Sequence, residues 1–411
     1  MSCDSSVEML QIFKHNDLIT KLKENKKINY FLINVDNFSN INSAYGYEIG
    51  NDVLGQILNY INMAKPTSST LYRFSADKFV LLDERDLDVN ELTSISEAIL
   101  SFFSQADIVI EHHSEFKVSL SIGISCAKGL SNITQAETAI DELRKMRRHH
   151  FYIYNAESAY VKEQEQKVYW ILKIKEAVAD ESLIAYFQPI INNTTQKIEK
   201  YECLARIKDE DKIISPYLFM DAARITGNIS YITKAIIRQS FEKFSKTNFD
   251  FSINITGEDL LLDYLEDFLL KNAKEYNIDP SRVVLEMLED IATLDNEISS
   301  GRTTLAQLNS LREKGFQIAI DDFGAENSNM SRLLELKPDY LKIDGSFIKN
   351  IVTDENSIII VESIVFLCKK SGIKVIAEYV HNKEVQEKVK ALGIDYSQGY
   401  YFSEPKPDIN S

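Results

Sequence analysis

The chain has 411 residues, of which 44% are hydrophobic and 26% are charged, a composition typical of a folded chain of two or three domains. Its formal net charge of −16 at pH 7 excludes broad binding to the phosphate backbone of nucleic acids, which needs a basic surface. No apolar stretch reaches the ~18 residues of a membrane span, no signal peptide is visible, and the four cysteines form no Cys-x-x-Cys pair, so we expect a cytoplasmic protein without a zinc site or disulfide framework.

The first part of the chain predicts a mixed α+β domain. Its strongest strand signal is NYFLINVDNF, where apolar residues run from Tyr30 to Val35. Further on, the tetrapeptide SADK indicates a tight turn between two short strands. The other expected elements are helices at 5–25 and 135–147, a helix entered through the two glycines of AYGYEIGNDVLGQILNYI, and strands at 71–73, 79–82, 117–124 and 151–154.

This order of elements resembles the GGDEF (diguanylate cyclase) domain. The family motifs correspond here to Asn34-Val35-Asp36-Asn37-Phe38, to Asn42, to Gly46-Tyr47-Glu48-Ile49-Gly50-Asn51, and to the hairpin Ser75-Ala76-Asp77-Lys78-Phe79. Several positions depart from the family pattern. Asn34 stands for the first metal-binding aspartate, Ser75 and Ala76 stand for the glycines that approach a triphosphate, and Lys78 stands for a catalytic glutamate. The inhibitory product site falls on Pro66 and Ser69 and is missing.

These departures bear on what the resemblance implies for the first domain. A two-metal phosphoryl-transfer site loses the negative charge that holds its metal ions when one carboxylate is replaced by an amide and another by an ammonium. We therefore predict that this domain does not synthesise cyclic di-GMP. Asn42 matches a guanine-contacting position, so two interpretations stay open: residual GTP binding with a regulatory role, and a structural or dimerising domain.

A charged stretch with helical spacing follows the first domain. Apolar residues recur at Val168, Ile171, Leu172 and Ile174, which predicts a linker helix within 156–182. The predicted domains are thus residues 1–155, the linker 156–182, and residues 183–411. The single tryptophan, Trp170, lies in this linker, either as a contact between domains or as part of a core.

From residue 183 onward, short apolar strands alternate with longer helical segments. Eight strands with intervening helices predict an α/β fold of the TIM-like (β/α)₈ barrel type, in which functional residues sit at the C-terminal ends of the strands. One of the helices is expected from Asp354 to Ser371, closed by Gly372. The expected strands are 185–189, 200–205, 250–255, 283–287, 317–320, 340–343, 374–377 and 399–402.

The stretch from Gln317 to Asp344 carries the clearest sign of chemistry. A buried strand ends on the adjacent carboxylates Asp321 and Asp322, and the next strand places Lys342 among apolar neighbours. Adjacent strand residues point to opposite sides, so this pair surrounds a cation only where the strand ends. The alternative for Asp321-Asp322 taken alone is a strand end that reaches solvent. Buried charges cost several kcal/mol unless they are paired or bind a metal, which favours an electrostatic site.

Other polar residues lie at the ends of the remaining barrel strands. Several carboxylates and an amide in one barrel mouth would repel one another unless cations neutralised them, and all-oxygen ligands suit Mg²⁺ or Mn²⁺ rather than zinc. The residues are Glu202, Asn254, Glu286, Glu289, Asp321, Asp322, Lys342, Glu378 and Gln398.

These motifs resemble, in order and over essentially all of 183–407, the EAL family of cyclic di-GMP phosphodiesterases. The signature itself is Glu202-Cys203-Leu204-Ala205-Arg206. The resemblance implies a two-metal hydrolase that converts cyclic di-GMP to linear pGpG, and family members often pair, which makes a homodimer the expected state. The implied roles are metal binding for Glu202, Asn254, Glu286, Asp321 and Asp322, catalysis for Lys342 and Glu378, and substrate binding for Gln188, Arg206, Asp344 and Gln398.

The second half also departs from its family at several positions. The loop after Asp-Asp-Phe-Gly reads Ala325-Glu326-Asn327-Ser328, His381 replaces a second glutamate, Leu288 replaces a threonine, and Arg224 stands where a glutamate is common. The altered loop and His381 favour a catalytically silent receptor for cyclic di-GMP or a protein-interaction scaffold. The complete set of implied metal ligands favours the enzyme, which is the function we predict.

Overall fold

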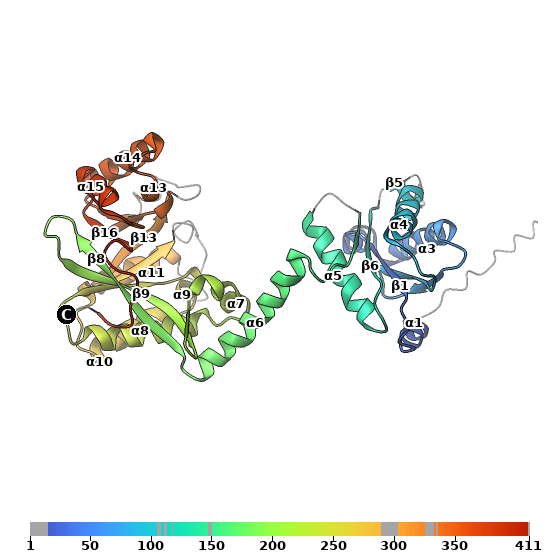
Figure 1. Ribbon diagram of the computed structural model, residues 1–411, viewed down its shortest axis with the longest axis horizontal. Coiled ribbons are helices and arrows are strands. Elements are labelled where there is room, and N and C mark those ends of the chain that lie inside the picture. The colour runs from blue at the N-terminus through green and yellow to red at the C-terminus, as the bar shows by residue number, and fades with distance from the viewer. Residues whose placement is uncertain are drawn as a thin grey trace, which may run out of the picture. The chain divides into compact units, whose positions relative to one another are not determined.

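The computed structural model describes residues 15–104, 108–110, 113–116, 118–146, 150–288, 303–324, 333 and 336–409. The chain divides into two compact units, Met1–Glu165 and Gln166–Ser411, which are described separately here (Figure 1). Helix α6 (Ala159–Ala179) occupies most of the predicted linker, while the predicted domain limits at 155 and 183 stay a prediction. Within the described part of the chain, every helix is too short or too polar to cross a lipid bilayer.

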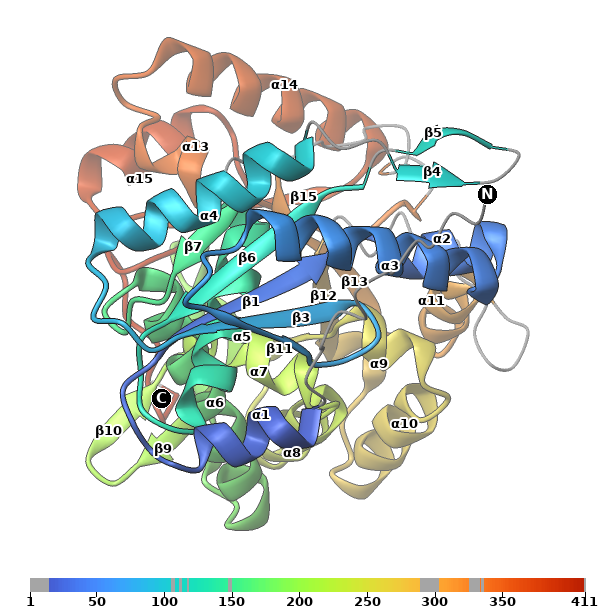
Figure 2. The same cartoon turned by 90° about the vertical axis from the view of Figure 1, so that its right-hand side faces the viewer.

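A five-stranded sheet with the order β2-β3-β1-β6-β7 forms the centre of the first unit. The middle strand β1 (Asn29–Val35) is antiparallel to both of its neighbours. Because side chains alternate between the faces of a strand, Phe31 and Ile33 pack with α2, α3 and α4, whereas Tyr30 and Leu32 pack with α1 and α5 (Figure 2). The other strands of this sheet are β2 (Thr70–Arg73), β3 (Lys78–Asp83), β6 (Leu120–Ser125) and β7 (Phe151–Ile153). Strands β4 (Ile108–Ile110) and β5 (His113–Phe116) pair with each other in a separate two-stranded sheet.

The helices of this unit agree in part with the sequence-based expectation. The predicted hairpin around SADK is confirmed by β2 and β3. Within the described residues the first helix begins at His15, and positions 5–14 of the predicted helix lie outside them. Helices α2 and α4 were not predicted from the sequence. The helices are α1 (His15–Leu22), α2 (Phe38–Tyr45), α3 (Tyr47–Ala64), α4 (Val89–Ser104) and α5 (Ser131–Met146).

An eight-stranded closed barrel forms the second unit, which confirms the predicted TIM-like fold. Seven strands, from β9 through β11 to β16, run parallel, and β8 closes the ring between β16 and β9. Strand β8 is antiparallel to both neighbours, unlike the strands of a regular (β/α)₈ barrel. The reason is the short connection between β8 and β9, since a parallel crossover needs a dozen or more residues. Strand β10 pairs only with the far end of β9.

Most barrel strands lie where the sequence placed them, with one correction. Residues 399–402 were expected to form the last strand, but β16 comes earlier and Gly399 begins a turn, so Gln398 ends this strand rather than opening it. The strands are β8 (Leu183–Asn192), β9 (Ile198–Asp209), β10 (Lys212–Ile214), β11 (Asp250–Asn254), β12 (Val283–Leu288), β13 (Gln317–Phe323), β14 (Tyr340–Ile343), β15 (Lys374–Ala377) and β16 (Tyr396–Gln398).

Helices pack around the outside of this barrel and form its main hydrophobic core with the strands. The predicted stop at Gly372 is confirmed, because this residue caps α14 with a left-handed φ of 75°. Trp170, on α6, packs against the barrel core. The helices are η1 (Pro216–Leu218), α7 (Met220–Ile225), α8 (Ile229–Phe244), α9 (Gly257–Leu261), α10 (Leu265–Glu275), η2 (Pro280–Arg282), α11 (Thr304–Glu313), α13 (Gly345–Lys349), α14 (Glu355–Ser371) and α15 (Lys383–Ala391).

A small apolar cluster fills the inside of the barrel. It contains Ile190, Val284, Ala319, Tyr340, Ile376 and Tyr396, one residue from each of six strands. Because side chains alternate along a strand, residues two positions away from these also face inward and form the next layer. This apolar cluster is the floor on which the polar layer rests.

Candidate active site

The inward-facing layer above the barrel floor consists of predicted site residues. Each floor residue lies two positions from one of them, as Val284 does from Glu286 and Tyr340 from Lys342. The same spacing relates the remaining floor residues to Gln188, Asp321, Glu378 and Gln398. Strand alternation therefore gathers residues that are far apart in the sequence into one layer.

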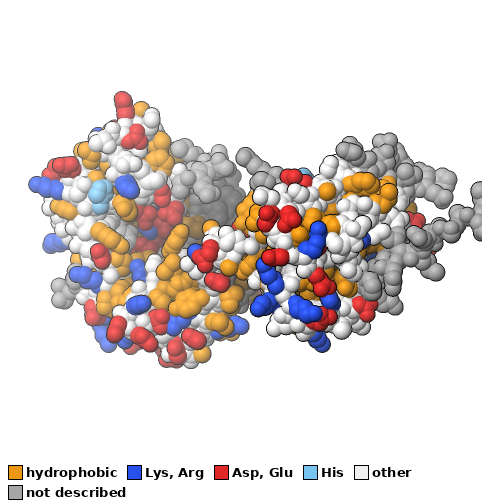
Figure 3. Space-filling view, turned by 45° about the vertical axis from the view of Figure 1, so that its right-hand side comes forward, with side chains coloured by type: hydrophobic (Ala, Val, Ile, Leu, Met, Phe, Trp, Pro, Cys, Tyr) orange, Lys and Arg blue, Asp and Glu red, His pale blue; other side chains and the backbone are white. Residues whose placement is uncertain are grey.

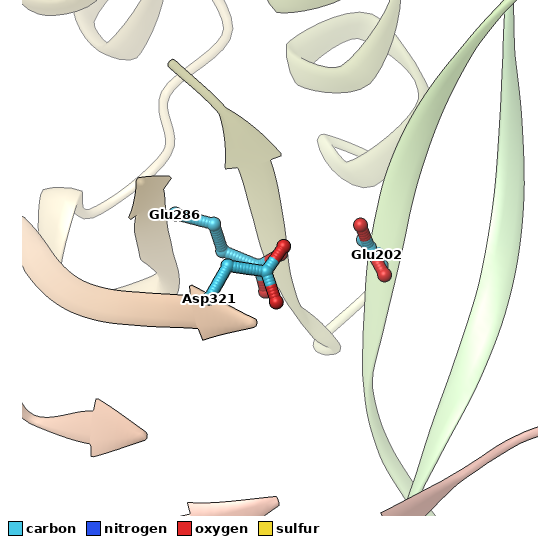
Figure 4. Close-up of side chains that lie close together, drawn as sticks. All are labelled: Glu202, Glu286 and Asp321. Atoms are coloured by element: carbon cyan, nitrogen blue, oxygen red, sulfur yellow. The ribbon is translucent and has the colours of Figure 1, made fainter. Parts of the chain in front are cut away.

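Lys342 forms the centre of this layer. Its ammonium lies 2.8 Å from Glu378, 2.9 Å from Asp321, 3.0 Å from Glu286 and 3.3 Å from Glu202. The lysine side chain is only 1% exposed, so these ion pairs are shielded from water. Figure 4 shows Glu202, Glu286 and Asp321 pointing toward one another from β9, β12 and β13. The predicted convergence of carboxylates on one barrel mouth is thus present in the structure.

Two amides fix the orientation of Glu202. Gln398 donates to Glu202 Oε2 at 2.6 Å, and Asn254, the last residue of β11, donates to Glu202 Oε1 at 2.8 Å. Gln398 also donates to Gln188 Oε1 at 3.1 Å. Both oxygens of Glu202 are therefore held by hydrogen bonds, which preorganises this carboxylate.

A bulge in β13 explains how the adjacent carboxylates Asp321 and Asp322 share one site. The strand register shifts between Ile320 and Phe323, and Asp322 adopts a left-handed φ of 52°. Aspartate tolerates this conformation. It directs the Asp322 side chain toward the side of the strand on which Asp321 lies, instead of toward the opposite face. As a result, oxygens of Asp321, Asp322 and Glu378 lie within 4.8 Å of one another.

Burial and mutual charge shift the titration of these groups. Burial raises the pKa of Glu286 to about 8, although the nearby Lys342 partly opposes it. Burial and the charge of Asp321 raise the pKa of Asp322 to about 6. Burial likewise raises the pKa of Glu378 well above its usual value. Burial acts the same way on Glu202, but Lys342 and the two amides outweigh it and lower the pKa of this carboxyl.

Two groups of carboxylates have the spacing of cation ligands. Glu202, Glu286 and Asp321 form one group, and Asp321, Asp322 and Glu378 form the other, each with its oxygens within 4.8 Å. Asp321 belongs to both groups, as expected of a carboxylate shared between neighbouring ions. The donors are all oxygens, which fits a hard divalent cation such as Mg²⁺ or Mn²⁺.

A cavity of about 890 Å³ opens beside this layer. Its volume lies within the range of small-molecule sites. Glu202, Asn254, Asp321 and Asp322 line one side of it, and the rest of the lining includes residues of β9, η1, α7, α8, α9 and β12. In the space-filling view, acidic side chains gather in one area of the barrel unit, next to apolar side chains (Figure 3).

The predicted substrate-binding residues lie in different places, and none of them lines this cavity. Gln188 and Gln398 are buried beside Glu202, where they hold the carboxylate layer. Arg206 is half-buried, with its guanidinium 5.9 Å from the ring of Tyr186. Asp344 caps α13 by accepting from the backbone N–H of Ser346.

The departures from the family pattern are also spread out. His381 is exposed, with Nδ1 3.2 Å from the carbonyl oxygen of Tyr379, and belongs to neither carboxylate group. Tyr379, next to Glu378, has a left-handed φ of 54°. Leu288 and Arg224 line the cavity. Glu289 and the loop Ala325-Glu326-Asn327-Ser328 lie outside the described residues.

In the first unit, the motif residues Asp36 and Lys78 make contacts within the chain. The carboxylate of Asp36 accepts hydrogen bonds from Asn34 at 3.0 Å, from Ser119 at 3.0 Å and from Ser121 at 2.8 Å. Lys78 forms an ion pair with Glu137 at 3.0 Å. These contacts satisfy the polar groups without a metal ion or a nucleotide.

Three cavity-lining residues were not predicted from the sequence: Tyr217 on η1, Met220 on α7 and Glu258 on α9. Each is an ordinary surface residue type, and the sequence gives no sign that α7 and α9 face each other. Arg224 was noticed only as a departure from the family. A signal was present in the capping box Thr256-x-x-Asp259, which fixes the start of α9 directly after Asn254.

Comparison with known families and proteins agrees with this geometry. Residues 172–405 match the EAL domain, and residues 11–150 match the diguanylate cyclase, GGDEF domain. The chain is 27% identical over 391 residues to the cyclic di-GMP phosphodiesterase PdeB of Shewanella oneidensis, covering 91% of this chain and 44% of PdeB. It is 32% identical over 266 residues to the probable cyclic di-GMP phosphodiesterase PdeA of Escherichia coli, covering 63% of this chain and 35% of PdeA. The chain thus spans less than half the length of these relatives.

Solved structures show the same folds. The PaMucR phosphodiesterase in complex with c-di-GMP is 25% identical, with a TM-score of 0.54, and the match covers 58% of this chain and 98% of that one. The S helix-GGDEF-EAL structure of LapD from Vibrio cholerae is 15% identical, with a TM-score of 0.52, and the match covers 95% of this chain and 94% of that one. The second similarity shows the fold alone, and it extends over both units.

Proposed function

Because the chain belongs to the EAL domain family, with a GGDEF domain ahead of the EAL domain, we propose that its barrel hydrolyses cyclic di-GMP to linear pGpG with the help of divalent metal ions. One observation carries the proposal: four carboxylates converge on Lys342, and two of them, with Asp322, line a cavity large enough for a small molecule. The names of PdeB and PdeA and the ligand of the PaMucR structure support the choice of substrate.

The oxygen donors of the layer fit Mg²⁺ or Mn²⁺. Glu202, Asn254, Glu286, Asp321 and Asp322 would hold the ions, in agreement with the two overlapping carboxylate groups. Bound ions would lower the pKa of a water molecule and neutralise charge on the phosphate.

The remaining chemistry falls to Lys342 and Glu378. Hydrolysis joins a water oxygen to phosphorus, breaks the bond between phosphorus and the 3′ oxygen, and leaves a 5′ phosphate. Glu378 follows the last residue of β15, with Oε1 2.8 Å from the Lys342 ammonium. We assign Glu378 as the group that accepts the proton of the water, and Lys342 as the cation that orients Glu378 and Asp321.

We also propose that the GGDEF domain does not synthesise cyclic di-GMP and acts as a regulatory or dimerising module. The internal contacts of Asp36 and Lys78 support this proposal, since both side chains are satisfied within the chain. GTP binding at this domain, a homodimer and a cytoplasmic location stay predictions.

A second candidate function is a catalytically silent receptor for cyclic di-GMP. The favouring observation is that the Lys342 ammonium already pairs with three of the carboxylates assigned to the metal ions, Glu202, Glu286 and Asp321. Incubation of the purified protein with cyclic di-GMP separates the two functions. Chromatographic appearance of pGpG with Mg²⁺ or Mn²⁺ supports the enzyme, whereas calorimetric binding in Ca²⁺ without any product in Mg²⁺ or Mn²⁺ supports the receptor.

A further inference from the structure

An ion pair joins two short helices across the wall of the cavity. Arg224, on α7, places Nε 2.9 Å from Oε1 of Glu258, on α9. Both side chains line the cavity beside the carboxylate layer. They are 54% and 41% exposed, so neither side chain is shielded from a ligand in the cavity, and Arg224 Nη1 also lies 3.7 Å from Asp221 Oδ1. An exposed ion pair of this kind adds little to the stability of the fold. Stability therefore does not explain why the pair lies in the cavity wall.

The surroundings of this pair suit a flat aromatic ligand group. Tyr217, Met220 and Leu288 line the same cavity and are partly or largely exposed. Tyr217 is 91% exposed, which is unusual for a large aromatic side chain. Exposed aromatic and apolar side chains around a few polar groups are typical of pockets that hold a ring system.

We propose that Arg224 and Glu258 form a guanine-reading pair that selects cyclic di-GMP over other cyclic dinucleotides. The inference rests on the function proposed above and names the residues that determine its base specificity. Guanine presents the acceptor O6 beside two donors, N1–H and the 2-amino group. The guanidinium donates to O6, and the two carboxylate oxygens of Glu258 accept from N1–H and the amino group.

Other purine bases match this pair of side chains poorly. Adenine lacks the 2-amino group and presents a donor where guanine has O6, so Arg224 faces no acceptor there. Hypoxanthine keeps O6 and N1–H but lacks the 2-amino group, which leaves one oxygen of Glu258 without its partner. A site built to bond a polar group rejects an analogue that lacks it, because its own groups are left unpaired.

The test measures dissociation constants of the full chain in Ca²⁺ for cyclic di-GMP, cyclic di-IMP and cyclic di-AMP. The variants are Arg224→Ala, Arg224→Lys, Glu258→Ala and Glu258→Gln. The matched control is Arg238→Ala, which removes an exposed guanidinium on α8 outside the cavity. Thermal unfolding of each variant establishes that it is folded.

The wild type is expected to prefer cyclic di-GMP. A good bidentate contact to a base gives about 5- to 150-fold discrimination. Arg224→Ala and Glu258→Ala should each raise the dissociation constant of cyclic di-GMP by a factor within that range. Each should change the dissociation constant of cyclic di-AMP less than threefold. Glu258→Gln should remove the preference for cyclic di-GMP over cyclic di-IMP, and Arg238→Ala should change nothing.

Two results would overturn the inference and leave the proposed function intact. An equal loss of affinity for all three dinucleotides in the variants would mean that the pair contacts phosphate or has a structural role. Unchanged dissociation constants would mean that the pair lies outside the binding site. If the folded wild type neither binds nor hydrolyses cyclic di-GMP, the proposed function fails, and the guanine-reading pair fails with it.

Discussion

Replacing Lys342 with methionine removes an ammonium that four buried carboxylates share. At an effective dielectric constant of about 20, an ion pair near 3 Å is worth about 5 kcal/mol, much of which is offset by desolvation. Breaking a buried pair by removing one partner typically costs about 3–5 kcal/mol. We expect the free energy of unfolding of the barrel to fall by about that amount at pH 8 without metal ions.

The pH dependence separates charge from packing in this variant. Methionine is close to lysine in size, so little packing is lost. As the pH falls below about 8, Glu286 and Glu378, whose pKa values burial already raises, take up protons and no longer need a cation. The destabilisation should therefore shrink at low pH.

Trp170 provides the assay. It is the single tryptophan of the chain and packs against the barrel core, so its fluorescence follows unfolding of the barrel. With a slope of about 3 kcal/mol per molar urea, the midpoint should drop by about 1–1.7 M. A loss below about 1 kcal/mol at pH 8, or an equal loss at pH 5, would refute the reasoning.

Lys200 offers a matched control in the same barrel. Its buried ammonium lies 3.5 Å from the ring centroid of Tyr340 and, among the described residues, has no hydrogen-bond acceptor. Burial lowers the pKa of Lys200 to about 8. Lys200→Met should therefore cost less than about 1 kcal/mol or stabilise the barrel, since Asp250 acts on Lys200 only through its charge and, among the described residues, no carboxylate loses a hydrogen bond.

Three further predictions follow from the site and its surroundings. Glu202→Gln should lower Mn²⁺ affinity by about 10-fold or more, because a neutral amide replaces a carboxylate that belongs to one of the ligand groups; calorimetry with unchanged affinity would contradict the assignment. Mn²⁺ affinity should rise from pH 6 to pH 8 with release of protons, because burial raises the pKa of Asp322 to about 6 and of Glu286 to about 8; calorimetry in buffers of different ionisation enthalpy checks this, and a flat profile speaks against it. Tyr379→Gly should be about 1 kcal/mol more stable than Tyr379→Ala, because the left-handed φ of 54° is costly for alanine but not for glycine. Equal urea midpoints of the two variants would contradict this explanation.

The barrel could be predicted from the sequence because its strands carry apolar runs bounded by polar residues. The limits 340–343 and 374–377 agree with β14 and β15, where short parallel strands are buried on both faces. The last strand was misplaced because Gly399-Tyr400-Tyr401-Phe402 has strong strand propensity, whereas the chain turns at Gly399, with φ 155°. Tertiary contacts overrode local propensity there.

The site was predictable at the level of its strands but not of its side-chain contacts. Period-two alternation explains why the charged layer lies above the apolar floor, and both layers can be read along each strand. The bulge at Asp322 and the fourfold contacts of Lys342 depend on register between strands, which one sequence does not encode locally. That Gln188 and Gln398 bind substrate stays a prediction, and the sequence did not indicate that Gln398 donates to both Glu202 and Gln188 inside the barrel.

The most direct measurement is the conversion of cyclic di-GMP by the wild type and by Glu202→Gln. Each protein is incubated with Mg²⁺ or Mn²⁺ and, separately, with a chelator, and the products are separated by chromatography. The account predicts pGpG from the wild type with metal ions and none from the variant or in the chelator. Tight binding without pGpG from the wild type, or full activity of Glu202→Gln, would contradict a metal-dependent phosphodiesterase built on this carboxylate layer.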